Sequence, residues 1–239
     1  MTLKQCFTPV AGAVVVLAVT ALAGMMLLRS PQVHADEGNN DDSRIQKGFA
    51  IAPVPLNLTE KNRDLVGIGS YIVNAQADCN GCHSIDPSTE YSPGGSPFLR
   101  FPFFNGTKKV NPATYLAGGA DFGPFGPTLP HLYTRNLTPD ITGRPEGGHT
   151  LPEFMQIMRH GTDYDGVHPN CPATTGIPSG NCFTPPFNGA LLQVMPWPTF
   201  QDMSDRDLEA IYAYLSAIPC NPGPVIANAP YLRNVCPVK

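Results

Sequence analysis

The sequence predicts an all-α, loop-rich fold with three or more short helices. Three segments carry apolar residues at helical spacing, and no alternating apolar run is long enough to indicate a strand. The 27 prolines and 23 glycines cluster between these segments. Long turn-rich connections are therefore expected between short helices rather than a dense helical bundle.

Size and charge restrict the classes of protein to consider. A chain of 239 residues suits one domain with extensions, or at most two small domains. Hydrophobic residues make up 42%, which is enough for a core. The net charge of −4 and the lack of a basic run argue against nucleic-acid binding.

The N-terminus is typical of an export signal. Lys4 precedes an apolar run over residues 10–28, and Val33-His34-Ala35 precedes an acidic segment. This pattern predicts a signal peptide over 1–35, cleaved after Ala35. The alternative is an uncleaved anchor, because the run nearly spans a bilayer. Either way the remainder is expected to be periplasmic or otherwise exported, held at the outer face of the inner membrane if residues 10–28 are retained.

Export makes disulfides plausible among the cysteines outside the N-terminal segment and the motif described below. These are Cys171, Cys182, Cys220 and Cys236. Four cysteines allow three pairings. Pairing of Cys171 with Cys182 and of Cys220 with Cys236 is favoured, because each would close a short Pro/Gly-rich loop. Free buried thiols are the alternative.

Three helices are expected after a flexible lead-in over 36–58. The first covers about 62–75, where Gly67 and Gly69 indicate a close contact with another helix. The second starts at a Thr150/Glu153 capping box and stops at Gly161. The third starts at Ser204, with Asp207 as its capping partner, and ends before Pro219. Its apolar positions are Leu208, Ile211, Tyr212 and Leu215.

The most specific motif is the segment Cys79-Asn-Gly-Cys82-His83, which is the c-type haem attachment pattern. Two cysteines at this spacing can bind the two vinyl groups of one haem c, and His83 can then ligate the iron. A thioredoxin-type dithiol would need a preceding strand, whereas a helix is expected here. A zinc site would need a second ligand pair at metal-site spacing, and the sequence has none.

Met195 is the favoured sixth ligand of the iron. It precedes Pro196 in an irregular stretch shortly before the last helix, so its backbone is restrained. Methionine ligation raises the reduction potential relative to two histidines. The alternatives are that Met195 is ordinary packing, or that another side chain ligates the iron. The rivals are Met155, Met158, Met203, His131, His149, His160 and His168.

Two filled axial positions favour electron transfer over catalysis, because a haem enzyme generally needs an open position at the iron. The chain is therefore expected to be an electron carrier rather than an enzyme. One alternative is a peroxidase-like haem enzyme with a displaceable sixth ligand. Another is a structural cytochrome whose long loops mediate contacts between copies.

The chain resembles class I c-type cytochromes, and more narrowly the cytochrome subunits of membrane-associated alcohol and gluconate dehydrogenases. The resemblance covers roughly 62–219, with gaps. Its matching stretches are 69–71 with 78–83, 136–143, 150–161 and 195–219. It departs from those subunits in carrying one haem motif instead of several, and in expanded loops over about 86–115 and 163–192.

The resemblance implies a class I cytochrome c-like domain over 59–219 with a C-terminal extension over 220–239. It implies ligation by His83 and Met195, and electron delivery from a dehydrogenase toward a terminal oxidase, with other cytochromes as alternative redox partners. It also implies that the first helix crosses the last, with Gly67, Gly69 and Tyr71 meeting Leu208, Ile211 and Tyr212. Finally, it places three residues near the haem propionates: Arg135, Asn136 and Trp197.

Overall fold

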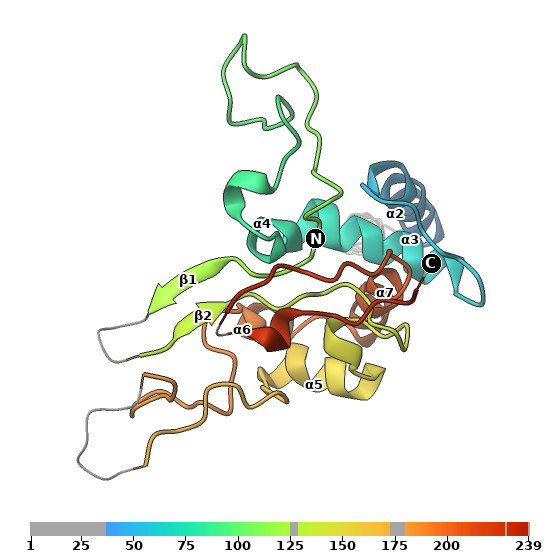
Figure 1. Cartoon of the computed structure of the whole chain (residues 1–239). Helices are drawn as coiled ribbons and strands as arrows, with labels where there is room; N and C mark the ends of the chain where they lie inside the picture. Colours follow the sequence, from blue (N-terminus) through green and yellow to red (C-terminus); the bar gives the residue numbers. More distant parts are fainter. Residues whose placement is uncertain (1–36, 125–128, 173–179, 228, 239) are drawn as a thin grey trace, which may run out of the picture. The chain divides into compact units, whose positions relative to one another are not determined.

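The computed structural model describes residues 37–124, 129–172, 180–227 and 229–238 (Figure 1). Side chains are described from residue 41 onward. The predicted signal segment 1–35 lies outside these residues. Contacts divide the chain into the units Met1–Gly38 and Asn39–Lys239, and the features below belong to the second. Within the described ranges, no helix is long and apolar enough to cross a membrane.

The core forms where helix α3 (Arg63–Tyr71) packs against α7 (Asp205–Leu215). Asn62 caps α3 by accepting from the backbone N–H groups of Asp64 and Leu65. At the crossing, a Cβ added to Gly69 would collide with the carbonyl of Ala210. Glycine therefore lets the two backbones approach, which confirms the close helix contact predicted at this position. The residues buried along the two helices include Val66, Ile68, Leu208, Ile211 and Leu215.

A buried polar cluster joins the end of α3 to α7. Helix α3 continues as a π-helical turn, Ile72–Gln76, which carries Asn74. Tyr115 donates to Asn74 Oδ1 at 2.6 Å, and the hydroxyls of Tyr115 and Tyr214 lie 2.8 Å apart. Burial raises the pKa of both tyrosines, so each stays a neutral hydroxyl that can donate. These bonds fix the orientation of α3 on α7.

Two further helices next to this core are α5 (Leu151–His160) and α6 (Trp197–Phe200). Both bonds of the Thr150/Glu153 capping box are present, and Gly161 ends α5 with a φ of 67°. The predicted second helix is thus confirmed. For α7, Ser204 accepts from the backbone N–H of Asp207, which confirms the cap. The short helix α6 was not predicted.

The all-α prediction is wrong. Strands β1 (Asp121–Pro124) and β2 (His131–Tyr133) pair antiparallel in a two-stranded sheet (Figure 1). The pairing continues past the strands, where Gly119 N–H donates to Thr134 O at 2.8 Å. The strands have four and three residues and an irregular register, so they show no alternating pattern along the sequence.

The segment predicted to be a flexible lead-in contains helix α2 (Glu37–Ile51). Ser70 donates to the carbonyl of Gly48 at 2.7 Å, and Arg44 forms an ion pair with Asp207 at 3.1 Å. A Cβ on Gly67 would meet Ile45 and Phe49. Gly67 therefore faces α2 and not α7, which corrects the crossing expected for that glycine.

Two disulfides join the pairs favoured from the sequence. Cys171 bonds to Cys182 and Cys220 bonds to Cys236, with Cα–Cα distances of 5.1 and 5.6 Å. The second disulfide closes the C-terminal segment, whose Asn234 donates to the carbonyl of Thr138 at 2.7 Å. The C-terminal residues are thus tied to the loop that follows β2.

Candidate functional site

The Cys-x-x-Cys-His motif forms a helix of its own, α4 (Cys79–His83). Asp78 interrupts the preceding helix with a φ of 46°. The buried Asn80 side chain accepts from the Leu116 N–H at 2.9 Å, and Gly118 N–H donates to the carbonyl of His83 at 2.8 Å. The backbone around 116–118 therefore holds the motif in place.

Both motif thiols are free and have raised pKa values. Burial, followed by the charge of Asp78, raises the pKa of Cys79 to about 12 and also raises that of Cys82. Reactive dithiols and zinc ligands need the thiolate form, which a raised pKa disfavours. Among the described side chains, no group of three or more His, Cys, Asp and Glu is placed to hold a metal ion. The raised pKa values therefore argue against a reactive dithiol, and two unpaired, uncharged thiols are compatible with thioether attachment.

His83 is held as an iron ligand would need to be held. Its Nδ1 lies 2.8 Å from the carbonyl of Arg135, so Nδ1 carries the proton and Nε2 keeps its lone pair. Burial, as the largest cause, lowers the pKa of His83, and the nearby charge of Arg135 lowers it further. The imidazole is thus neutral, which is the form that binds a metal.

The three motif side chains line a cavity together with Met195 and Arg135. Strands β1 and β2, helices α5 and α7, and the stretch before α6 supply most of the remaining wall, which is largely apolar. That wall includes Phe122, Leu132, Tyr133, Phe154, Met158, Leu191, Leu192, Phe200, Ile211 and Leu215. An apolar cavity with two free thiols and a neutral imidazole on its wall fits a haem attached through thioether bonds.

Met195 lies in a restrained segment. Trp197 N–H donates to the carbonyl of Met195 at 2.8 Å, and the Trp197 indole N–H donates to Leu192 O at 3.0 Å. Leu192 N–H in turn donates to the carbonyl of Gly161, at the end of α5. This segment is therefore attached to the end of α5, and the Met195 side chain lines the cavity from a backbone that these hydrogen bonds restrain.

Two rivals of Met195 also reach the cavity wall. Met158 of α5 and His168 both line it, and His168 Nδ1 is a buried nitrogen without a hydrogen-bond partner in the described structure. Met155 and Met203 pack against the hydrophobic core. Five sequence candidates are not among the cavity-lining residues within the described ranges: Met155, Met203, His131, His149 and His160.

Comparison with known proteins points to cytochrome subunits. The gluconate 2-dehydrogenase cytochrome c subunit of Pantoea cypripedii is 27% identical over 65% of this chain and 23% of its own length. The cytochrome c subunit of the quinone alcohol dehydrogenase of Gluconacetobacter polyoxogenes is 26% identical over 70% of this chain and 24% of its own. The fructose dehydrogenase cytochrome subunit of Gluconobacter japonicus is 24% identical over 83% of this chain and 27% of its own length. No family model matches the chain.

These relatives support a relationship to the cytochrome c subunits of dehydrogenases. The chain spans about a quarter of the length of the curated relatives it matches. A relationship to cytochrome subunits is compatible with three features of this chain: the Cys-x-x-Cys-His motif, the cavity that it lines and the hydrogen bond that orients His83.

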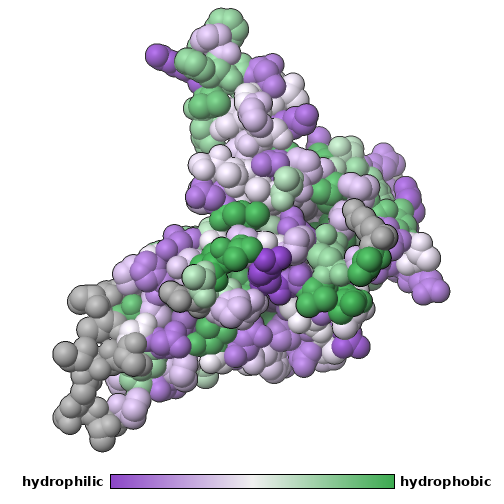
Figure 2. Space-filling model, viewed as in Figure 1, coloured by the Kyte–Doolittle hydropathy of each residue, from purple (hydrophilic) through white to green (hydrophobic). Residues whose placement is uncertain are grey.

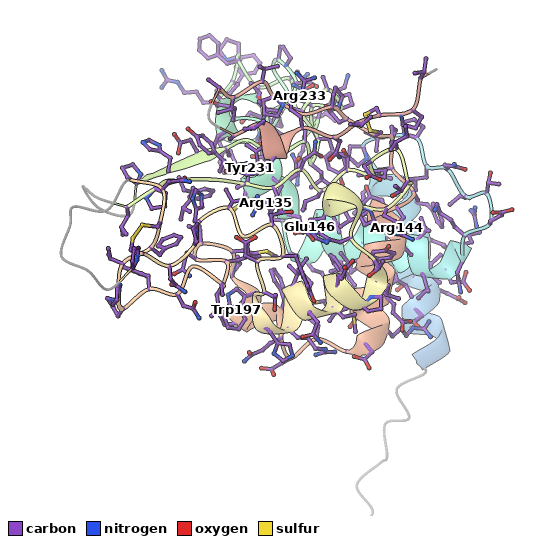
Figure 3. The ribbon with its side chains drawn as sticks, turned by 60° about the horizontal axis from the view of Figure 1, so that its bottom comes forward. Arg135, Arg144, Glu146, Trp197, Tyr231 and Arg233 are labelled. Atoms are coloured by element: carbon purple, nitrogen blue, oxygen red, sulfur yellow. A yellow bond between two sulfur atoms is a disulfide. The ribbon has the colours of Figure 1, made fainter. Side chains whose placement is uncertain are left out.

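Of the three residues expected near the haem propionates, only Arg135 lines the cavity. Its guanidinium is paired with Asp163 at 2.8 Å and with Asp165 at 3.3 Å, and it lies over the ring of Tyr231. Asn136 is buried, donates to Asn221 O at 2.9 Å and accepts from Thr138. Trp197 donates to Leu192 as described above. Asn136 and Trp197 are therefore not among the described cavity-lining residues, although Trp197 bonds to one of them, Leu192, and Figure 3 shows Trp197 apart from Arg135.

Two cavity residues were not anticipated from the sequence. Glu146 lies in a turn before α5, close to Arg135 (Figure 3), and burial raises its pKa to about 7. Tyr231, in the C-terminal segment, lies against Arg135 with 4.9 Å between guanidinium and ring. Sequence offered little to find them, because each is isolated from the motif and reaches the cavity only through the tertiary fold.

Proposed function

We propose that this chain is an exported c-type cytochrome that binds one haem through Cys79 and Cys82 and carries single electrons. The observation that carries the proposal is the arrangement around α4. Two free thiols and a neutral imidazole held by Arg135 O share one largely apolar cavity. The chain has a single Cys-x-x-Cys-His motif, which is the basis for one haem.

Haem bound in this cavity would supply an iron centre that is oxidised and reduced by one electron. The chain's part is to hold that group and set its surroundings. His83 offers Nε2 because Nδ1 is engaged by Arg135 O. The apolar side chains of the cavity exclude water, which limits the reorganisation of solvent around a change in charge.

Met195 is proposed as the second axial ligand. Its place on the cavity wall and the attachment of its segment to Gly161 through Leu192 support this role. A thioether held by a restrained backbone would occupy the second ligand position of a bound haem iron, which would leave no free position for a substrate. The proposed activity is therefore electron transfer through the cofactor's edge, not chemistry at the iron.

The proposed electron donor is a dehydrogenase, and the acceptor is an oxidase or another cytochrome. The relatives support the dehydrogenase, since their names describe cytochrome subunits of gluconate, alcohol and fructose dehydrogenases. Export to the periplasm is proposed from residues 1–35, and it agrees with the two disulfides.

The covalent attachment can be tested by mass spectrometry of the purified protein from a host that matures c-type cytochromes. We expect one added haem per chain and a pyridine haemochrome spectrum typical of two thioether bonds. Cys82→Ser should shift that spectrum to the single-thioether form, and a Cys79→Ser/Cys82→Ser double variant should lose covalent haem. The control is Cys171→Ser/Cys182→Ser, which should keep haem. A chain without covalent haem would contradict the proposal.

A further inference from the structure

A projecting loop over residues 91–110 follows the motif helix and its neighbouring 3-10 turn. It is the long excursion at the top of Figure 1. Backbone bonds close its neck: Ser92 N–H donates to Lys109 O, and Lys109 N–H donates to Gly95 O, both at 3.0 Å. Tyr91 and Val110 form a bridge beneath them. The loop therefore has a defined base.

This loop exposes large apolar side chains, of which Phe98 lies edge-on against Tyr91 at the base, with 6.2 Å between ring centroids. The exposed fractions are 85% for Phe98, 44% for Leu99, 87% for Phe101 and 66% for Phe103. Four such side chains within six positions make one patch, and Figure 2 shows hydrophobic groups gathered along the projection. Other exposed apolar side chains of the described residues, such as Ile141 and Val225, are scattered singly. An exposed cluster of this kind marks an interaction surface.

The charge of the loop is opposite to that of the chain. Residues 91–110 contain Arg100, Lys108 and Lys109 and no acidic residue, whereas the whole chain carries −4. All three cations are exposed, and within the described residues none of them forms an ion pair. Arg100 lies among the apolar side chains, and the two lysines follow them towards the neck. Cations flanking an inserted apolar tip are suited to anionic headgroups.

We propose that residues 91–110 form a membrane-docking loop, in which Phe98, Phe101 and Phe103 enter the interface of an anionic phospholipid bilayer. Arg100, Lys108 and Lys109 would then contact the headgroups. A bilayer suits a convex projection, because several apolar side chains can enter it together without a matching socket. This proposal does not depend on haem binding, and it differs from anchoring through residues 10–28.

The loop base lies on the same side as the motif. Figure 1 shows the loop leaving the molecule next to α4, the helix that carries the motif. A bilayer bound by the loop would therefore be approached by the motif side of the molecule. For a carrier that exchanges electrons with membrane-bound partners, this orientation would shorten the transfer path.

Binding can be measured with the full-length purified protein by co-sedimentation with vesicles of phosphatidylglycerol and phosphatidylcholine, and with pure phosphatidylcholine. We expect stronger binding to the anionic vesicles, weakened by salt. Phe101→Ser/Phe103→Ser should reduce the affinity about tenfold or more. Lys108→Gln/Lys109→Gln should reduce it several-fold on anionic vesicles only. The matched controls, Ile141→Ser and Lys47→Gln/Lys61→Gln, should bind as the unmodified chain does.

A second readout separates the loop from the N-terminal apolar segment. A tryptophan introduced as Phe101→Trp should be quenched by vesicles with brominated acyl chains, whereas one introduced as Ile141→Trp should not. An unquenched Phe101→Trp protein, or loop variants that sediment like the unmodified chain, would overturn the proposal. Loss of electron transfer to a soluble partner protein without any vesicle binding would instead assign the loop to a protein interface, which also overturns it.

Discussion

His83 and Met195 reach the same cavity by different means. His83 is fixed by one short bond from its own ring to Arg135 O. Met195 has no such bond from its side chain and depends on the attachment of its backbone segment. The orientation of His83 is therefore set by its own side-chain contact, whereas the position of Met195 is set by the segment that carries it.

Replacing Met195 by alanine should remove a sulfur ligand from the ferric haem protein. We expect Met195→Ala to lose the sulfur-to-iron charge-transfer band in the optical spectrum and to lower the reduction potential. Met203→Ala should keep both, because Met203 packs on the core and its carbonyl accepts from Arg159. If Met158→Ala rather than Met195→Ala abolished the band, the ligand would be assigned to α5 instead.

Glu146 should make stability depend on pH. Its pKa is raised from 4.5 to about 7, chiefly by burial. Below about pH 4.5 it is protonated in both the folded and the unfolded chain, so it contributes no penalty. As the pH rises from about 4.5 to about 7, the unfolded chain loses this proton while the folded chain still holds it. The free energy of unfolding therefore falls over this range, by up to roughly 3 kcal/mol once the pH has passed about 7.

Glu146→Gln should therefore be more stable than the unmodified protein above about pH 8, and nearly equal to it at about pH 4. Denaturant unfolding at both pH values measures this difference. Glu209→Gln, at an exposed position of α7, should show little difference at either. A Glu146→Gln variant that is less stable at high pH would mean that the ionised carboxylate makes a stabilising contact.

At the scale of elements, the crossing of α3 and α7 depends on the glycine at position 69. Gly69→Ala gains helix propensity of about 1 kcal/mol, but its methyl group would meet the carbonyl of Ala210. We expect the clash to prevail and to lower the free energy of unfolding by about 1–3 kcal/mol. Thermal or denaturant unfolding measures it, with Glu209→Ala as the control on the same pair of helices. An unchanged or raised stability would show that the backbones separate at little cost.

Elements with local signals could be predicted from the sequence. Helices α5 and α7 start at Thr150 and Ser204 caps, and their apolar residues recur at helical spacing. The sheet could not be predicted from the sequence, because its strands have too few residues to show alternation. It is held by backbone bonds such as Gly119 N–H to Thr134 O, which join segments apart in the sequence. Helix α2 was missed because its first half is polar. Its packing on α3 depends on the close approach of Gly48 to Gly67, which are far apart in the sequence and show no local pattern.

At the scale of the molecule, the C-terminal segment contributes to both stability and the cavity. The Cys220–Cys236 disulfide joins cysteines that are 16 residues apart in the sequence. Between them, Tyr231 contacts Arg135 and Asn234 donates to the carbonyl of Thr138. We expect Cys220→Ser/Cys236→Ser to lower the free energy of unfolding by about 3 kcal/mol. Denaturant unfolding under oxidising conditions measures the loss. Equal stability with and without this disulfide would contradict the structural role of the segment.

The site as a whole was only partly visible in the sequence. Cys79, Cys82 and His83 lie within five consecutive residues, so their chemistry could be predicted from spacing alone. Glu146 and Tyr231 come to the cavity from distant segments, and no local pattern indicates this. The placement of Asn136 and Trp197 near the haem edge follows from resemblance alone and stays a prediction; in the structure they bond to Asn221 and Leu192.

In the proposed cytochrome, His83 and Met195 fill both axial positions of one haem. The most direct measurement is the optical and EPR spectrum of the purified ferric protein, followed by cyanide addition. We predict a low-spin ferric haem with a sulfur-to-iron charge-transfer band and slow cyanide binding. A high-spin ferric haem that binds cyanide rapidly would contradict the electron-carrier account and favour a haem enzyme with an open coordination position.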